Sequence, residues 1–163
     1  MRLAAALLAS CSLVQAGLNP FVTTCPEVST MTDFEPSWYA GTWYEIIRDK
    51  STPFEINNEC VVADYTVRED GTLGVRNSGW GPRNGWHGIE GQARQVGDDD
   101  SGELHVSFEG MPESEESLNE PNYFVLDTDY DSYAIVYSCN NLYGYLIFDL
   151  LWVLSKTPTM SDD

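Results

Sequence analysis

The stretch Ala40–Lys50, "AGTWYEIIRDK", contains the start of the first predicted strand and places Gly41 two residues before Trp43. An indole ring near the start of a strand needs a space shaped for it, because aromatic side chains of this size bury a large area. We therefore expect Trp43 to fill a defined hole at one end of the fold. The remaining strands should show which fold has such a hole.

Eight candidate strands follow one another from this stretch to the end of the chain. Each is a short apolar or alternating run, and most are separated by turns rich in Gly, Asp and Asn. None is separated from the next by an apolar pattern of helix length. The runs cover residues 42–48, 60–68, 72–80, 86–96, 103–110, 122–128, 132–139 and 143–156.

This pattern predicts an all-β fold, an eight-stranded up-and-down antiparallel barrel, because closure removes the edges of the sheet. A barrel of eight strands is wide enough to be filled by side chains or to hold one small ligand. Alternation places small or apolar residues such as Ile89, Gly91 and Ala93 on one face of their strand. That arrangement fits a hollow barrel and a filled sandwich equally well.

The chain of 163 residues favours one domain preceded by a short leader. Residues 1–16, "MRLAAALLASCSLVQA", combine an early arginine, an apolar run too short to span a bilayer, and small residues at the cleavage positions. We predict a signal peptide over 1–16 and a domain over 17–163. The domain should be secreted, without an integral membrane anchor.

The net charge of −18 excludes one class of partner. Such a chain repels phosphate backbones, so we expect no binding to nucleic acid. Hydrophobic residues make up 42% of the chain and aromatic residues 12%, which is enough for a sizeable core despite the acidity.

Three separated stretches resemble the signature regions of the lipocalins. They are "GTWYEI" at 41–46, "DTDYDSYAIVYSC" at 127–139 and "WVLSKTP" at 152–158. Their order and spacing match that family from about Cys25 to Met160, and they resemble most the branch of apolipoprotein D and the bacterial outer lipocalins. The resemblance implies a cup-shaped barrel.

The resemblance also gives Trp43 a structural role. In lipocalins this tryptophan, introduced by the glycine matched here by Gly41, fills the closed end of the cup, and a basic residue after the eighth strand lies across its ring. Lys156 occupies that position, where the family mostly has arginine. Lysine lacks the planar stacking of arginine, so we expect the contact to be weaker by up to about 1 kcal/mol.

The cysteines of the expected domain are Cys25, Cys60 and Cys139, an odd number for an oxidising compartment. The resemblance implies a disulfide between Cys25 and Cys139. It matches Cys60 to a cysteine whose partner lies in a C-terminal tail. We expect the flanking helix of the family to begin at Ser161 and to be cut short, which would leave Cys60 unpaired.

The resemblance implies that the cup binds a small hydrophobic molecule of the lipid, sterol, retinoid or tetrapyrrole class, and we predict no cofactor. No lysine or arginine occupies a predicted pocket position, which favours a neutral ligand or one with an exposed head group. Phe148 and Leu150 fit core packing as well as ligand contact, and the choice stays open. Strand alternation and the resemblance together predict these ligand-binding residues: Tyr65, Asn77, Phe108, Tyr123, Val125, Val136, Phe148 and Trp152.

Two other functions remain as alternatives to a carrier. One is an enzyme of the same fold acting on a lipid through the Cys60 thiol, although its neighbour Glu59 supplies an acid and no base. The other is a protein-binding lipocalin with an empty cup. His87 and His105 lack the spacing of a metal site, so we expect no metal and place both histidines on the surface. We predict that the protein is not an enzyme.

Overall fold

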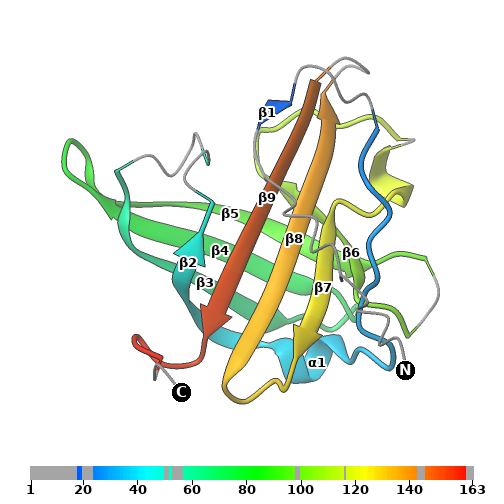
Figure 1. Cartoon of the computed structure of the whole chain (residues 1–163), viewed down its shortest axis with the longest axis horizontal. Coiled ribbons are helices and arrows are strands. Elements are labelled where there is room, and N and C mark those ends of the chain that lie inside the picture. The colour runs from blue at the N-terminus through cyan, green and yellow to red at the C-terminus, as the bar shows by residue number, and fades with distance from the viewer. Residues whose placement is uncertain are drawn as a thin grey trace, which may run out of the picture.

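The computed structural model describes residues 18–19, 24–49, 52, 57–97, 100–115, 117–142 and 146–160. It confirms the predicted closed barrel of eight antiparallel strands. Each strand pairs with the next, and the last pairs back with the first, which closes the barrel (Figure 1). The strands are β2 (Gly41–Arg48), β3 (Glu59–Val67), β4 (Leu73–Gly81), β5 (Gly85–Gln95), β6 (Glu103–Phe108), β7 (Tyr123–Thr128), β8 (Tyr133–Leu142) and β9 (Leu146–Ser155).

Three short elements are added to the predicted set. β1 (Leu18–Asn19) pairs with β9 opposite Ile147 and Phe148, beyond the part of β9 that pairs with β2. α1 (Pro36–Tyr39) precedes β2, and the 3-10 helix η2 (Ser117–Asn119) lies between β6 and β7. α1 begins with a proline and a side-chain cap from Glu35, which are local signals for a helix start. Its four residues are too few to produce a helical hydrophobic period, so the apolar pattern did not predict it.

The two ends of the barrel differ in how their inward-facing side chains are packed. At the end where β2 begins and β9 finishes, α1 lies across the barrel and the inner side chains are buried (Figure 1). Toward the other end, several inward-facing residues are half-buried, so solvent reaches them, although Leu150, between Phe148 and Trp152 on β9, is only 2% exposed. We call these the closed end and the open end. The half-buried inward-facing residues of the open half include Asn77, Ile89, Val106, Phe108, Phe148 and Trp152.

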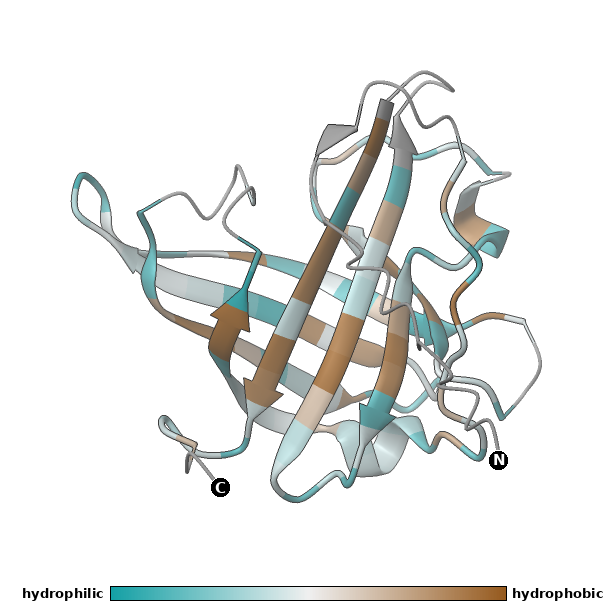
Figure 2. Cartoon of the chain, viewed as in Figure 1, coloured by the Kyte–Doolittle hydropathy of each residue, from teal (hydrophilic) through white to brown (hydrophobic). Residues whose placement is uncertain are grey.

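The inner and outer faces follow the two-residue alternation of the strands. Hydrophobic segments recur along β8 and β9, interrupted by pale or hydrophilic ones (Figure 2). Directly opposed pairs such as Val136 and Trp152, or Ala134 and Leu154, point to the same face of the sheet. The strand register therefore fixes which side chains enter the barrel.

A β-bulge in β2 changes this alternation at one place. Glu45 pairs with Leu154, but Ile47 pairs with Val153, so Ile46 is an extra residue. After the bulge Ile47 faces outward and is 61% exposed, while Arg48 lies opposite Trp152 on the inner face. Plain alternation from Trp43 would have placed Ile47 inside and Arg48 outside.

A disulfide joins Cys25 to Cys139 of β8, across a sequence separation of 114 residues. Loop-closure entropy gives such a link roughly 4–5 kcal/mol of stabilisation. It ties the segment before α1 to the outside of the barrel, where a second small cluster of buried residues contains Tyr137, Cys139 and Ile147. The predicted signal peptide at 1–16 and the expected helix start at Ser161 lie outside the described residues.

In the part of the chain that the structure describes, no helix has the length and apolar character needed to span a bilayer.

Candidate ligand-binding site

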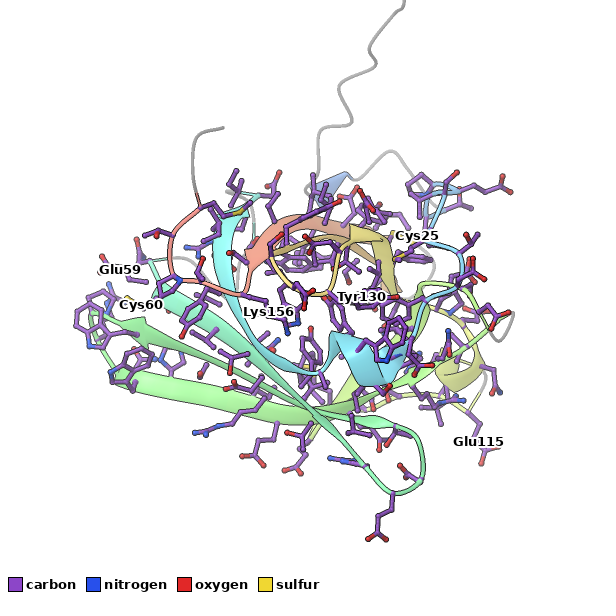
Figure 3. The ribbon with its side chains drawn as sticks, turned by 90° about the horizontal axis from the view of Figure 1, so that it is seen from below. Cys25, Glu59, Cys60, Glu115, Tyr130 and Lys156 are labelled. Carbon is purple, nitrogen blue, oxygen red and sulfur yellow. A yellow bond between two sulfur atoms is a disulfide. The ribbon has the colours of Figure 1, made fainter. Side chains whose placement is uncertain are left out.

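Trp43 fills the closed end of the barrel and is fully buried. Its indole nitrogen donates to the Tyr39 carbonyl at 2.8 Å, and the two rings stack with centroids 5.0 Å apart. The Lys156 ammonium nitrogen lies 4.0 Å from the centroid of the Trp43 ring and donates to the Ala40 carbonyl at 2.8 Å. Figure 3, which views the molecule from below, shows Lys156 and Tyr130 near the middle of the view. The contact between Trp43 and Lys156 thus joins the first strand of the barrel to the residue that follows its last strand.

Gly41 is required by both its conformation and its surroundings. Its φ of +105° lies in the region that side chains disfavour, and a Cβ atom there would stand 3.2 Å from the Lys156 nitrogen. Burial lowers the pKa of Lys156, against a smaller opposing effect of the Asp131 carboxylate. The ammonium group still keeps two partners, the Trp43 ring and the Ala40 carbonyl.

Three tyrosine hydroxyl groups meet above Trp43. The Tyr123 oxygen lies 3.1 Å from the Tyr39 oxygen and 3.1 Å from the Tyr65 oxygen. Burial raises the pKa of all three hydroxyls well above their usual value, with mutual repulsion as a further cause. The three groups are therefore neutral at physiological pH. They form a hydrogen-bonded floor inside an aromatic cluster.

The structure places all eight predicted ligand-binding residues on the inner face of the barrel and divides them into two groups. Tyr65, Tyr123, Val125 and Val136 are buried with Trp43 in the core of the closed half. The other four are half-buried on the wall nearer the open end. They are Asn77, Phe108, Phe148 and Trp152. The first group forms the floor of the interior, and the second group forms its solvent-reached wall.

Asn77 has an unusual polar atom for a barrel wall. Its side-chain oxygen Oδ1 is buried and has no hydrogen-bond partner among the described residues. Asn77 pairs with Ala63 of β3 and Ile89 of β5, so this oxygen is on an otherwise apolar part of the inner face. A buried acceptor without a partner costs roughly 1–3 kcal/mol. A ligand with a hydroxyl or N–H group could satisfy it.

The expectation that no basic side chain lines the interior is wrong, because Arg48 faces inward. Its Nη1 atom lies 2.5 Å from Oε1 of Glu45, and Nη2 donates to the Asn58 carbonyl at 3.0 Å. The Asn58 amide nitrogen lies 3.2 Å from Nε2 of His87. His87 is half-buried on the inner face, so its predicted surface position is wrong. A polar strip therefore crosses β2, the start of β3 and β5.

Sequence reasoning missed Arg48, which unbroken alternation from Trp43 would place on the outer face. The available signal was the isoleucine pair Ile46 and Ile47, since two adjacent branched apolar residues in a half-exposed strand fit a bulge. One inserted residue exchanges the faces of everything after it. The same reasoning succeeded on β3 to β9, where the predicted positions precede the bulges or lie in regular strand.

His105 is also misplaced by the sequence prediction, since it is only 3% exposed. Its Nδ1 atom donates to the Glu120 carbonyl at 2.7 Å, and Nε2 lies 3.2 Å from Oε1 of Glu113. Arg94 adds a hydrogen bond to the Leu118 carbonyl. These contacts hold the acidic loop between β6 and β7 against the outer side of β5 and β6. His105 is buried by this loop, which a strand pattern does not predict.

Cys60 is the residue on which the alternative enzyme function depends. Cys60 is unpaired and exposed, at a β-bulge where its φ is +54°. Figure 3 places it beside Glu59, on the same side of the view. Among the described residues, no three His, Cys, Asp or Glu side chains are grouped as metal ligands.

The sequence model of the family described as a lipocalin-like domain matches residues 34–163. Rat apolipoprotein D is 32% identical over 158 residues, which cover 97% of this chain and 79% of the relative. The outer membrane lipoprotein Blc of Escherichia coli K12 is 37% identical over 137 residues, covering 83% and 70%. The cockroach allergen Per a 4 has a similar fold, with a TM-score of 0.65 and 23% identity over 86% of this chain and 80% of the allergen. With its closed barrel and a family match over most of its length, this chain belongs to the lipocalins, a family that binds small hydrophobic ligands.

Proposed function

We propose that the protein is a secreted carrier that reversibly binds one small hydrophobic molecule inside the barrel. The observation that supports this proposal is the difference between the two halves of the inner face. The closed half is packed around Trp43, whereas Phe108, Phe148 and Trp152 point inward but stay half-buried. Phe108 and Trp152 contact the core on one side and leave part of their surface open to solvent. A ligand in the open half would cover that apolar surface, which removes it from water.

The wall residues have distinct roles in this proposal. Phe108, Phe148 and Trp152 contact the apolar body of the ligand, and Asn77 accepts a hydrogen bond from a ligand hydroxyl or N–H group. The floor, with Tyr65, Tyr123, Val125 and Val136, limits how deeply the ligand enters. This lining suits an elongated or planar molecule of the lipid, sterol, retinoid or tetrapyrrole class.

Secretion is supported by the disulfide between Cys25 and Cys139 and by the leader-like residues 1–16. Disulfides persist in oxidising compartments. The charge of −18 keeps the protein away from nucleic acid and suits a soluble extracellular carrier. We propose binding without catalysis and without a cofactor.

Native mass spectrometry of the secreted protein, before and after solvent extraction, tests the proposal. We expect an adduct of a small molecule that extraction removes, and chemical analysis of the extract identifies it. A protein that carries no adduct and binds none of the proposed ligand classes would overturn the carrier function.

Tryptophan fluorescence then tests where the ligand sits. Binding should change the emission of Trp152 on the inner face, so Trp152→Phe should lose most of the ligand-dependent change. Trp86→Phe is the matched control, because Trp86 is on β5 and 65% exposed. Equal losses in the two variants would argue against binding at the inner wall.

A further inference from the structure

The inner wall of the open half carries an ion pair, Glu45 with Arg48, between Trp152 on one neighbouring strand and Asn58 on the other side. The two side chains differ in their access to solvent. The Glu45 side chain is 8% exposed and the Arg48 side chain 24% exposed. The guanidinium group is therefore the member of the pair that a molecule entering from the open end meets.

A gain in folding stability does not explain why a charged pair occupies this part of the wall. Removing two charges from water costs free energy that their attraction only partly recovers, and apolar residues of similar size are often as stabilising or more so. A charged pair in the wall of a lipid-binding barrel therefore points to recognition of a polar group.

The surroundings hold Arg48 in a defined position. Glu45 binds one guanidinium nitrogen and the Asn58 carbonyl accepts from another. The Asn58 amide lies 3.2 Å from Nε2 of His87, whose Nδ1 donates to the Gly85 carbonyl at 3.0 Å. Asn58 is therefore itself held, and the Arg48 side chain is positioned before any ligand arrives.

The glycines of β4 make room for this strip. A Cβ atom on Gly81 would stand 3.1 Å from the His87 ring and 3.2 Å from Oδ1 of Asn58. A Cβ atom on Gly79 would stand 3.2 Å from a methyl carbon of Val61 and 3.7 Å from Asn58. Larger residues at either position would push the polar side chains out of place.

We propose that Arg48 is the head-group site for a single-chain amphiphile with an anionic oxygen head, a carboxylate or a phosphate, whose chain lies along Trp152 in the barrel. This inference rests on the proposed carrier function and narrows its ligand class. The planar guanidinium fork matches such oxygen groups and forms charge-assisted hydrogen bonds with them. Glu45, on the more buried side, keeps the guanidinium oriented and balances its charge while the barrel is empty.

Calorimetric titration of the delipidated protein with three probes of equal chain length tests the proposal. Lauric acid and dodecyl phosphate carry anionic heads, and dodecanol carries a neutral one. We expect at least one anionic probe to bind roughly tenfold to hundredfold more tightly than dodecanol. The better anionic probe identifies the head group.

Arg48→Met should remove this preference and leave dodecanol binding within about twofold. Glu45→Gln/Arg48→Met is the second variant, because it leaves no unpaired buried carboxylate if the single variant folds poorly. Arg76→Met is the matched control: Arg76 lies on the outer face of β4, 3.9 Å from Glu90, and its loss changes the net charge equally.

The outcomes separate the two proposals. Equal binding of all three probes to the unmodified protein would overturn the head-group site and leave the carrier function intact. The head-group site would also be overturned if the double variant kept the preference for anionic heads. The same holds if Arg76→Met removed that preference as fully as Arg48→Met does. Failure of every probe to bind would count against the carrier function itself.

Discussion

The closed and open ends of this barrel use the same inner face in opposite ways. At the closed end the polar groups around Trp43 have partners: the Trp43 indole donates to a carbonyl, the Tyr123 hydroxyl bonds to those of Tyr39 and Tyr65, and Lys156 has two contacts. At the open end the wall has a buried amide oxygen that no described residue contacts with a hydrogen bond, and an ion pair beside an aromatic ring. The closed end is thus a packed and hydrogen-bonded plug, whereas the wall of the open end keeps polar groups beside half-buried aromatic rings. In the proposed function, the first stabilises the fold and the second recognises a ligand.

Removing the indole at the closed end should lower the free energy of unfolding more than any of the other substitutions below. Trp43→Ala deletes a fully buried ring and the contact with Lys156, and we expect a loss of about 3–5 kcal/mol in the free energy of unfolding. Urea denaturation followed by circular dichroism measures it. Trp86→Ala should change stability little, because most of that side chain is exposed. Similar losses in both variants would contradict the assigned role of Trp43.

The tyrosine floor should show a smaller but clear effect. Tyr123→Phe removes the central hydroxyl and leaves those of Tyr39 and Tyr65 buried without it, so we expect a loss of about 1–3 kcal/mol. Tyr133→Phe, which removes a hydroxyl bonded to Asp127 at the surface, should cost less. The denaturation midpoints of the two variants make the comparison. If Tyr123→Phe proved neutral, the hydroxyl network would not contribute to stability.

Asn77→Leu should shift stability in the opposite direction. The substitution removes a buried oxygen that has no described partner and replaces it with an apolar group of similar size. We expect the free energy of unfolding of the ligand-free protein to stay the same or rise by up to about 1 kcal/mol. A clear loss of stability, measured by thermal unfolding, would show that Asn77 supports the fold rather than recognition.

The smallest expected effect concerns the turn between β7 and β8, beside Lys156. Burial alone would raise the pKa of Asp129, but hydrogen bonds from Ser132, Tyr133 and the Asp131 amide lower it to about 2. Because the folded-state pKa is below the unfolded value of about 3.9, the contribution to stability is present above that value and is lost as the pH falls toward 2.

Asp129→Asn should therefore reduce stability at neutral pH by a few tenths of a kcal/mol, since the carboxylate is exposed and screened. The difference from the unmodified protein should shrink between pH 4 and pH 2. Thermal unfolding across this pH range tests the prediction. A difference that grew on acidification would reverse the assigned sign.

The sequence predicted much of this molecule because its strands are short, alternating and separated by clear turns. All eight barrel strands lie within a few residues of their predicted bounds, and β8 extends further, to Leu142. The inner face was predictable wherever alternation ran unbroken, as from Leu104 to Phe108. The prediction of the inner face failed at the bulge of β2, where one extra residue turned Arg48 inward.

By itself, the sequence determined the eight antiparallel strands, their order and the residues that can face inward, since these depend on local periodicity and turn chemistry. Its resemblance to the lipocalins, and not its periodicity, favoured a hollow barrel over a filled sandwich. Only the tertiary structure decided which inward-facing residues are packed and which stay open to solvent. It also decided the described partners of Arg48, the burial of His105 and the burial of an Asn77 oxygen to which no described residue bonds. Those features depend on strand register and on loops folding back over strands, and both are set by contacts between residues far apart in the chain.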